Sequence, residues 1–168
     1  KDGNYTAENL LKNNISDAEL SNSAALETLH GQFTETHDDI FNVWDRNFIP
    51  LYNAYQFDEL EVEYAADEIT NLNESYVELQ KEVENISVPD DFSENERRRI
   101  QEIKDDLLLA ISNRSLAVIE FKSMLGSDEV SHQAFMDIHI NNSDRYLDEV
   151  QKVNAELALK NEELITVK

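Results

Sequence analysis

The sequence predicts an all-α fold, an elongated antiparallel up-down-up-down four-helix bundle, and three observations support this prediction. The 168 residues include only three Gly, two Pro and no Cys, which argues against a turn-rich β-sandwich or a disulfide-stapled miniprotein. Hydrophobic residues make up 40% of the chain, enough for the core of one domain. Apolar residues also recur every three or four positions over long stretches, which is the period of an amphipathic helix.

The first long helix is expected to begin near Asp17. Pro50 either ends this helix or kinks a longer one, because proline lacks an amide hydrogen and its ring collides with the preceding turn. A helix kinked at Pro50 would make a three-helix bundle the alternative fold. Residues 1–15 are expected to form a polar tether or a short helix, and residues 16–168 a single helical-bundle domain. The inward positions expected in the first helix are Leu26, Leu29, Phe33, Ile40 and Trp44.

The second helix carries the most regular apolar pattern in the chain. Its apolar residues step alternately by three and four, as in the seam of a coiled coil: Val62, Ala65, Ile69, Leu72, Tyr76, Leu79, Val83 and Ile86. We interpret it as one helix of an antiparallel bundle, because the other segments have wider apolar faces. It should end at Ser87-Val88-Pro89, since the residue before a proline avoids the α-helical conformation.

The third helix has a clear start signal. Ser93-Glu94-Asn95-Glu96 predicts a capping box, in which the side chains of Ser93 and Glu96 each accept a hydrogen bond from the other's amide. Gly126 is expected to end this helix and Ser127 to cap the fourth, which should run to about Leu164. The expected inward positions are Ile100, Ile103, Leu107, Ala110, Ala117, Phe121 and Met124 in the third helix, and Phe135, Ile138, Tyr146, Val150, Val153 and Leu157 in the fourth.

The charge balance limits the classes of partner. With 36 acidic and 14 basic residues, the net charge is −22, which repels nucleic acid phosphates and anionic lipids. The run Arg97-Arg98-Arg99 lies among acidic residues and is interpreted as ion pairing on a solvated helix face. No apolar run is long enough to cross a bilayer and no signal peptide is evident, so contact with a membrane is expected only through a lipid anchor outside this sequence.

Two segments hold all the histidines: ETLHGQFTETH, residues 27–37, and EVSHQAFMDIH, residues 129–139. Each contains a Glu-x-x-His element of the kind that di-metal helix bundles use. The candidate metal ligands are His30, His37, His132, His139, Glu27 and Glu129. The two histidines of each segment are about 10 Å apart along a helix axis, which excludes one site of four histidines.

If the first and last helices are antiparallel neighbours, His30 approaches His139 and His37 approaches His132. Each pair with a nearby carboxylate would suit Zn, Mn or Fe. The alternative interpretation is that these are histidines at the edge of the core, hydrogen-bonded to carboxylates. A smaller possibility is a pH-responsive pair, since neighbouring carboxylates favour the charged imidazole.

The segment NFIPLYNAYQF, residues 47–57, is more apolar than a connection requires. Its residues Tyr52, Tyr55 and Phe57 form either a plug on the end of the bundle or a surface for a protein partner. The sequence contains no Cys nucleophile, Gly-x-Ser-x-Gly elbow, phosphate-binding loop or dinucleotide fingerprint. We therefore expect a non-enzymatic protein with a binding role, and a metal-binding bundle is the alternative.

The chain has a polar start, KDGNYTAENLLKNN, a helix break, ISVPDDFSENERRRI, and long Asn- and Glu-rich helices such as DEITNLNESYVELQKEV. In these features the chain resembles the small helical lipoproteins that Gram-positive bacteria display outside the membrane, including those described as cell-wall-binding. The resemblance implies an extracytoplasmic protein anchored at the cell surface through a lipidated Cys before Lys1. The expected partner of the binding role is an unknown protein or envelope component, and the sequence leaves open whether the protein is a monomer or a dimer.

Overall fold

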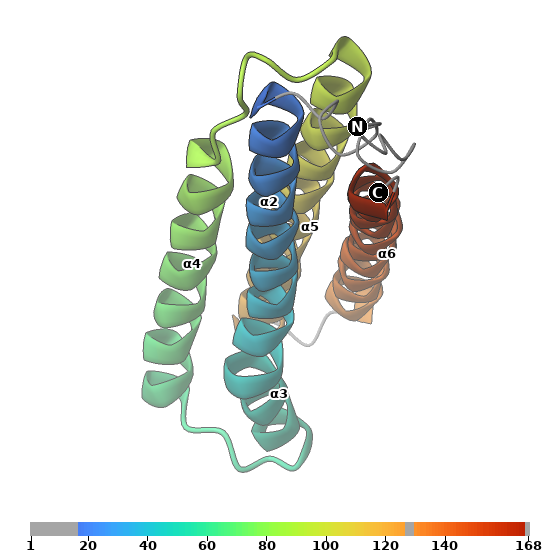
Figure 1. The fold of residues 1–168 in the computed structure, drawn as a ribbon. Helices are drawn as coiled ribbons and strands as arrows, with labels where there is room; N and C mark the ends of the chain where they lie inside the picture. Colours follow the sequence, from blue (N-terminus) through green and yellow to red (C-terminus); the bar gives the residue numbers. More distant parts are fainter. Residues whose placement is uncertain (1–16, 127–129, 167–168) are drawn as a thin grey trace, which may run out of the picture.

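The structure, a computed structural model, describes residues 17–126 and 130–166. These residues form α2 (Asp17–Val43), a π-helical segment η1 (Trp44–Phe48), α3 (Ile49–Gln56), α4 (Val62–Asn85), α5 (Glu94–Gly126) and α6 (Val130–Thr166). α2, η1 and α3 follow one another without a loop, and this composite helix packs with α4, α5 and α6 around one hydrophobic core (Figure 1). The predicted all-α fold and the packing of four helices are confirmed, and the three-helix alternative is not adopted. The predicted tether, residues 1–15, lies outside the described residues.

The helix neither ends nor breaks at Pro50. The π-helical segment η1 comes directly before it, and the Ile49 amide at its end donates to the Trp44 carbonyl, one residue farther back than in an α-helix. Pro50 then occupies the first turn of α3, where a missing amide hydrogen costs little. The π turn shifts the hydrogen-bond ladder next to the proline, and the helix continues to Gln56.

α3 ends in a Schellman motif. The Glu59 amide donates to the Ala54 carbonyl at 2.9 Å and the Asp58 amide to the Tyr55 carbonyl at 3.1 Å. Asp58 has a φ of 58°, in the left-handed region that Asp tolerates better than most residues. The chain reverses here, and in Figure 1 this connection to α4 lies at the opposite end of the bundle from the connection between α4 and α5.

The predicted seam of α4 and the predicted start of α5 are confirmed. The described side chains of the seam, Ala65 to Ile86, are all buried, whereas Val62 is not among the described side chains. At the capping box the Ser93 amide donates to Glu96 Oε2 at 2.9 Å, and the Glu96 amide donates to the Ser93 hydroxyl at 3.2 Å. Burial acts to raise the pKa of Glu96, but the bonds from Ser93 and the Lys160 ammonium outweigh it, so the pKa lies below its ordinary value.

The predicted inward face of α6 is partly wrong. Val150, Val153 and Leu157 are buried as expected, but Phe135 and Ile138 are 52% and 50% exposed. The side chains that face the core in their place are Met136, Ile140, Ser143 and Leu147, which are buried or pack against the core. The start of α6 carries apolar residues on two faces, so that periodicity alone did not decide which face is buried.

Contacts along α6 fix which parts of the chain lie side by side. The Ser23 hydroxyl of α2 donates to the Asn161 side chain at 2.6 Å. The Tyr52 hydroxyl of α3 donates to Gln133 at 2.8 Å. The start of α2 therefore lies beside the end of α6, and α3 lies beside the start of α6.

Arg114 of α5 is a charged residue inside the core, with 2% of its surface exposed. Its guanidinium lies 4.3 Å from the centre of the Trp44 ring and 5.7 Å from that of Phe41. Its Nη2 donates to Asp144 Oδ1 at 2.5 Å, while Nε and Nη1 have no hydrogen-bond partner among the described residues. Burial lowers the pKa of Arg114, and the Asp144 carboxylate opposes this effect. One carboxylate and two aromatic rings thus offset part of the free-energy cost of removing this cation from water.

We expect Arg114→Ala to lower the free energy of unfolding by about 3 to 5 kcal/mol, because it leaves a cavity and breaks the ion pair with Asp144. Arg114→Met, which keeps the apolar stem, should cost less than half as much, since only the partly exposed Asp144 loses its partner. Urea unfolding followed by circular dichroism measures both. A loss below about 1 kcal/mol for Arg114→Ala would contradict a structural role for this cation.

Candidate functional site

The predicted histidine pairs do not form. The Asn154 side chain of α6 donates to the His30 carbonyl at 3.3 Å, which places His30 about 22 Å along the helix from the level of His139. Gln133, next to His132, instead bonds to Tyr52. The expected approaches of His30 to His139 and of His37 to His132 are both wrong, because α3 continues the first helix past Pro50 and pairs with the start of α6.

Three of the histidines bond to polar neighbours at the edge of the core. His132 Nδ1 lies 2.6 Å from Glu120 Oε2, and His139 Nδ1 lies 3.2 Å from the Asn113 side-chain oxygen. His37 Nδ1 lies 3.1 Å from Asp38 Oδ1 on its own helix. The candidate ligand Glu27 is exposed on α2, and Glu129 lies outside the described residues. Within residues 17–126 and 130–166, no three or more His, Cys, Asp or Glu side chains are grouped so as to hold a metal ion.

The aromatic cluster at α3 divides into buried and exposed parts. The ring centres of Tyr52 and Tyr55 lie 5.9 and 5.5 Å from that of Phe121, both near edge-to-face. Phe57, by contrast, is 73% exposed. Tyr52 and Tyr55 therefore pack as a plug on this end of the core, and Phe57 is the member available to a partner.

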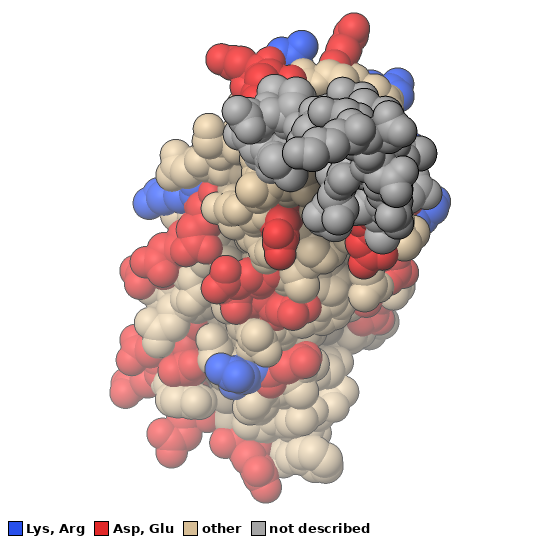
Figure 2. Space-filling view, viewed as in Figure 1, with Lys and Arg blue, Asp and Glu red and all other residues tan. Residues whose placement is uncertain are grey.

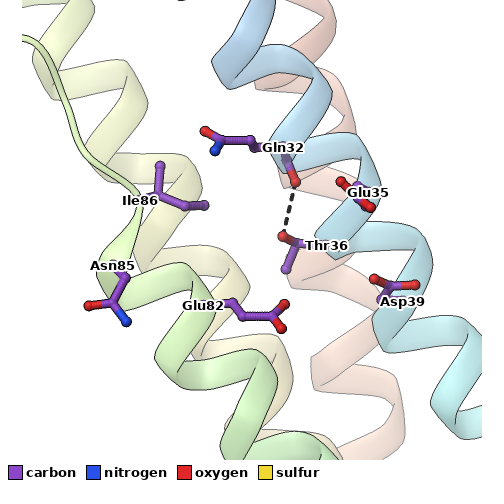
Figure 3. Close-up of a pocket in the computed structure, with 7 residues that line it drawn as sticks. All are labelled: Gln32, Glu35, Thr36, Asp39, Glu82, Asn85 and Ile86. Carbon is purple, nitrogen blue, oxygen red and sulfur yellow. Dashed lines mark hydrogen bonds between the residues drawn. The ribbon is translucent and has the colours of Figure 1, made fainter.

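A groove between α2 and α4 is lined by carboxylates. Two adjoining hollows of about 480 and 400 Å³ share Asp39 and Glu82 in their walls. Figure 3 shows Glu82 extending from α4 toward α2, where Glu35 and Asp39 stand beside the groove. On the part of this side that Figure 2 shows in colour, acidic side chains are numerous and basic ones are few. Carboxylates therefore face each other across the groove, and solvent and Arg46, which also lines the second hollow, reduce their repulsion.

A second surface has the opposite character. We call it the α5–α6 face, and it consists of exposed apolar side chains: Leu109, Leu116 and Ile119 of α5 and Phe135 and Ile138 of α6. Along the helix axes, the contact between Glu120 and His132 lies toward one end of the α5–α6 face, and the contact between Asn113 and His139 lies toward the other end. Leu116, Ile119, Phe135 and Ile138 lie between these two contacts, so the two helices present them at the same level.

The α5–α6 face is almost free of charge. Between Asp106 and Glu120 the one ionisable residue of α5 is Arg114, which is buried. Between Val130 and Ser143 the one carboxylate of α6 is Asp137, which accepts a hydrogen bond from Gln133 at 2.9 Å. Since Gln133 bonds in turn to Tyr52, Asp137 belongs to the side of α6 that faces α3. Sequence reasoning missed this face because it assigned Phe135 and Ile138 to the core.

Carboxylates crowd together where the other half of α5 meets α6. Burial raises the pKa of the Asp106 carboxyl, and the neighbouring carboxylates of Glu149, Asp105 and Glu102 raise it further. A carboxyl whose pKa is higher in the folded than in the unfolded chain destabilises the fold once it is ionised.

We expect Asp106→Asn to raise the free energy of unfolding near neutral pH by at most about 1 kcal/mol, because solvent screens partly exposed carboxylates. The gain should vanish at about pH 3, where the carboxyl is protonated in the folded and the unfolded chain alike. Urea unfolding at the two pH values measures the difference. Asp67→Asn, at an exposed position of α4, is the control, and an equal gain there would show a general charge effect.

The aromatic cluster gives a separate expectation. Tyr55→Ala should lower the free energy of unfolding by about 2 kcal/mol, because it removes a half-buried ring from Phe121. Phe57→Ala should change stability by less than about 0.5 kcal/mol, as is usual for exposed positions. Thermal unfolding of the two variants makes the comparison, and equal losses would place Phe57 in the core as well.

Comparison with protein-family models, curated proteins and solved structures gives no match. The resemblance to surface lipoproteins therefore stays a prediction from the sequence. No described helix is both long enough and apolar enough to cross a membrane.

Proposed function

We propose that this protein is a non-enzymatic binding protein, an up-down-up-down helical bundle displayed at the cell surface, whose α5–α6 face binds a protein partner. The observation that carries the proposal is the α5–α6 face itself. Five exposed apolar side chains lie on the two paired helices α5 and α6, in stretches that contain few charged residues although the chain has a net charge of −22. Soluble proteins seldom leave such a patch uncovered unless it is a site of interaction.

The antiparallel topology is supported by contacts between helices. The start of α2 bonds to the end of α6 through Ser23 and Asn161. α5 and α6 are also antiparallel, because Arg99 near the start of α5 forms an ion pair with Glu156 near the end of α6 at 3.3 Å, while Glu120 near the end of α5 lies against His132 near the start of α6. In such a bundle α5 and α6 form a hairpin that offers two adjacent helices to a partner.

The cell-surface location is supported by the polar start and the long Asn- and Glu-rich helices, in which the chain resembles surface lipoproteins. Its acidic surface disfavours nucleic acids and anionic envelope polymers as direct ligands. A protein or an uncharged envelope component is the partner class that this surface fits. The metal-binding alternative would need ligands other than the predicted histidine pairs, and no described group favours it.

Phe57 is proposed as a second point of contact. It lies at the α3 end of the bundle, as does Val130 at the start of α6, and both are strongly exposed. Tyr52 and Tyr55, earlier in the same segment, pack against Phe121 of the core. A contact there would extend a partner interface beyond the α5–α6 face.

Site-specific photo-cross-linking in the source cells tests the proposal. A photoreactive phenylalanine analogue at Leu116 should give a discrete cross-linked product. The same analogue at Leu159 of α6, which is 61% exposed but outside the α5–α6 face, should not. Denaturing electrophoresis and mass spectrometry identify the product. Absence of a product at Leu116, or equal products at both positions, would contradict binding through this face.

A further inference from the structure

We propose that the α5–α6 face binds a second copy of this chain, with the two α5 helices packed antiparallel about a two-fold axis. This inference rests on the proposed binding role of the face and names its occupant. It draws on the spacing of the exposed residues of α5, on the scarcity of charged residues in the face, and on the net charge of the whole chain.

The exposed residues of α5 have a spacing that is the same when counted from either end of the helix. Leu109, Ser112, Leu116 and Ile119 are all exposed and follow one another by steps of three, four and three. This is the spacing of an antiparallel coiled-coil seam. A two-fold axis at the level of Arg114 puts Leu109 opposite Ile119 of the second copy and Ser112 opposite Leu116 of the second copy. Each small Ser side chain then leaves room for a Leu, as close helix packing requires.

The same pairing keeps the two copies of Asp105 apart, whereas Glu120, which lies against His132 of its own copy, comes within about 5 Å along the axis of Asp105 of the second copy. The exposed carboxylate nearest the seam is Asp105, and in this arrangement it lies about 27 Å along the axis from Asp105 of the second copy. That separation exceeds the Debye length of about 8 Å at physiological ionic strength. A cationic partner would find its counter-charges on the acidic sides of the bundle. The uncharged α5–α6 face matches another uncharged apolar face, which a second copy necessarily has.

α6 widens the contact on one side of the seam. Phe135 and Ile138 lie at the level of Leu116 and Ile119 and are about half exposed. In a two-fold arrangement each copy contributes both helices of its hairpin. The buried centre would then combine Leu and Ile from α5 with Phe and Ile from α6, as in the apolar centre of homodimer interfaces.

Sedimentation velocity of the purified full chain tests self-association. Over about 5 to 500 µM protein the dimer fraction should rise with concentration, and it should rise again between about 0.05 and 0.5 M NaCl. Salt strengthens this association because each copy carries a charge of −22, whereas salt would weaken binding to a cationic partner. A protein that stays monomeric throughout would overturn the proposal.

Two matched variants locate the interface. Leu116→Glu should lower the dimer association constant by at least about tenfold, because it buries a carboxylate in the seam. Leu159→Glu adds the same charge at an exposed position of α6 outside the face and should leave the constant unchanged. Circular dichroism confirms that both variants remain folded. A dimer that survives Leu116→Glu would place the interface elsewhere and overturn the proposal.

Cysteine cross-linking tests the orientation, and the chain has no Cys of its own. Leu109→Cys and Ile119→Cys variants, mixed and mildly oxidised, should form the mixed disulfide in preference to either homodimer, because disulfides need Cα atoms within about 7 Å. A preference for the Leu109→Cys homodimer would indicate parallel packing and overturn the arrangement. This readout requires no destabilising charge.

The cross-linking in cells separates this proposal from the broader one. A product at Leu116 with the mass of two copies supports both. A product with a different protein, from a chain that is monomeric in solution, overturns self-association and leaves the binding role of the face standing. No product at Leu116 together with a monomer in solution overturns both.

Discussion

The packing of the four helices depends on the contacts that the buried guanidinium of Arg114 makes with them. Arg114 projects from α5 between Trp44 and Phe41 of the first composite helix and pairs with Asp144 of α6. Tyr76 of α4 is buried nearby, where desolvation raises the pKa of its hydroxyl and the charge of Arg114 opposes the rise. These neighbours of Arg114 come from all three of the other helices: the composite helix, α4 and α6. A guanidinium removed from water must keep its carboxylate and aromatic partners, so the helices cannot slide past one another without exposing or orphaning it.

Local signals predicted those parts of the fold that local interactions determine. The seam of α4 and the capping box at Ser93 follow from spacings within one helix, and the structure has both. The outcome at Pro50 was open, because the π-helical segment before it has no sequence signature of its own. That outcome sets the register between the first and last helices. The histidine pairing failed for this reason: it required non-local information that no spacing within a segment contains.

The α5–α6 face was only partly visible in the sequence. The run LLLAISNRSLAVI, residues 107–119, has a single ionisable residue in a chain that is 30% charged, and this contrast was the available signal. The run is apolar on several sides, so the sequence did not show which side faces solvent. On α6 the same ambiguity led Phe135 and Ile138 to be placed in the core, although they are about half exposed. Burial of one face among several apolar ones is decided by the neighbouring helices.

This ambiguity gives Arg114 a second role. A helix that is apolar all round can rotate about its axis and still bury hydrophobic surface, so hydrophobicity alone leaves the orientation of α5 open. A cation within the apolar run removes this freedom, because its partners Asp144 and Trp44 lie on one side only. With Arg114 held inside, Leu109, Leu116 and Ile119 must remain outside. We infer that the buried charge and the exposed apolar face are two consequences of one constraint: the residue that fixes the core also determines which surface the bundle offers for binding.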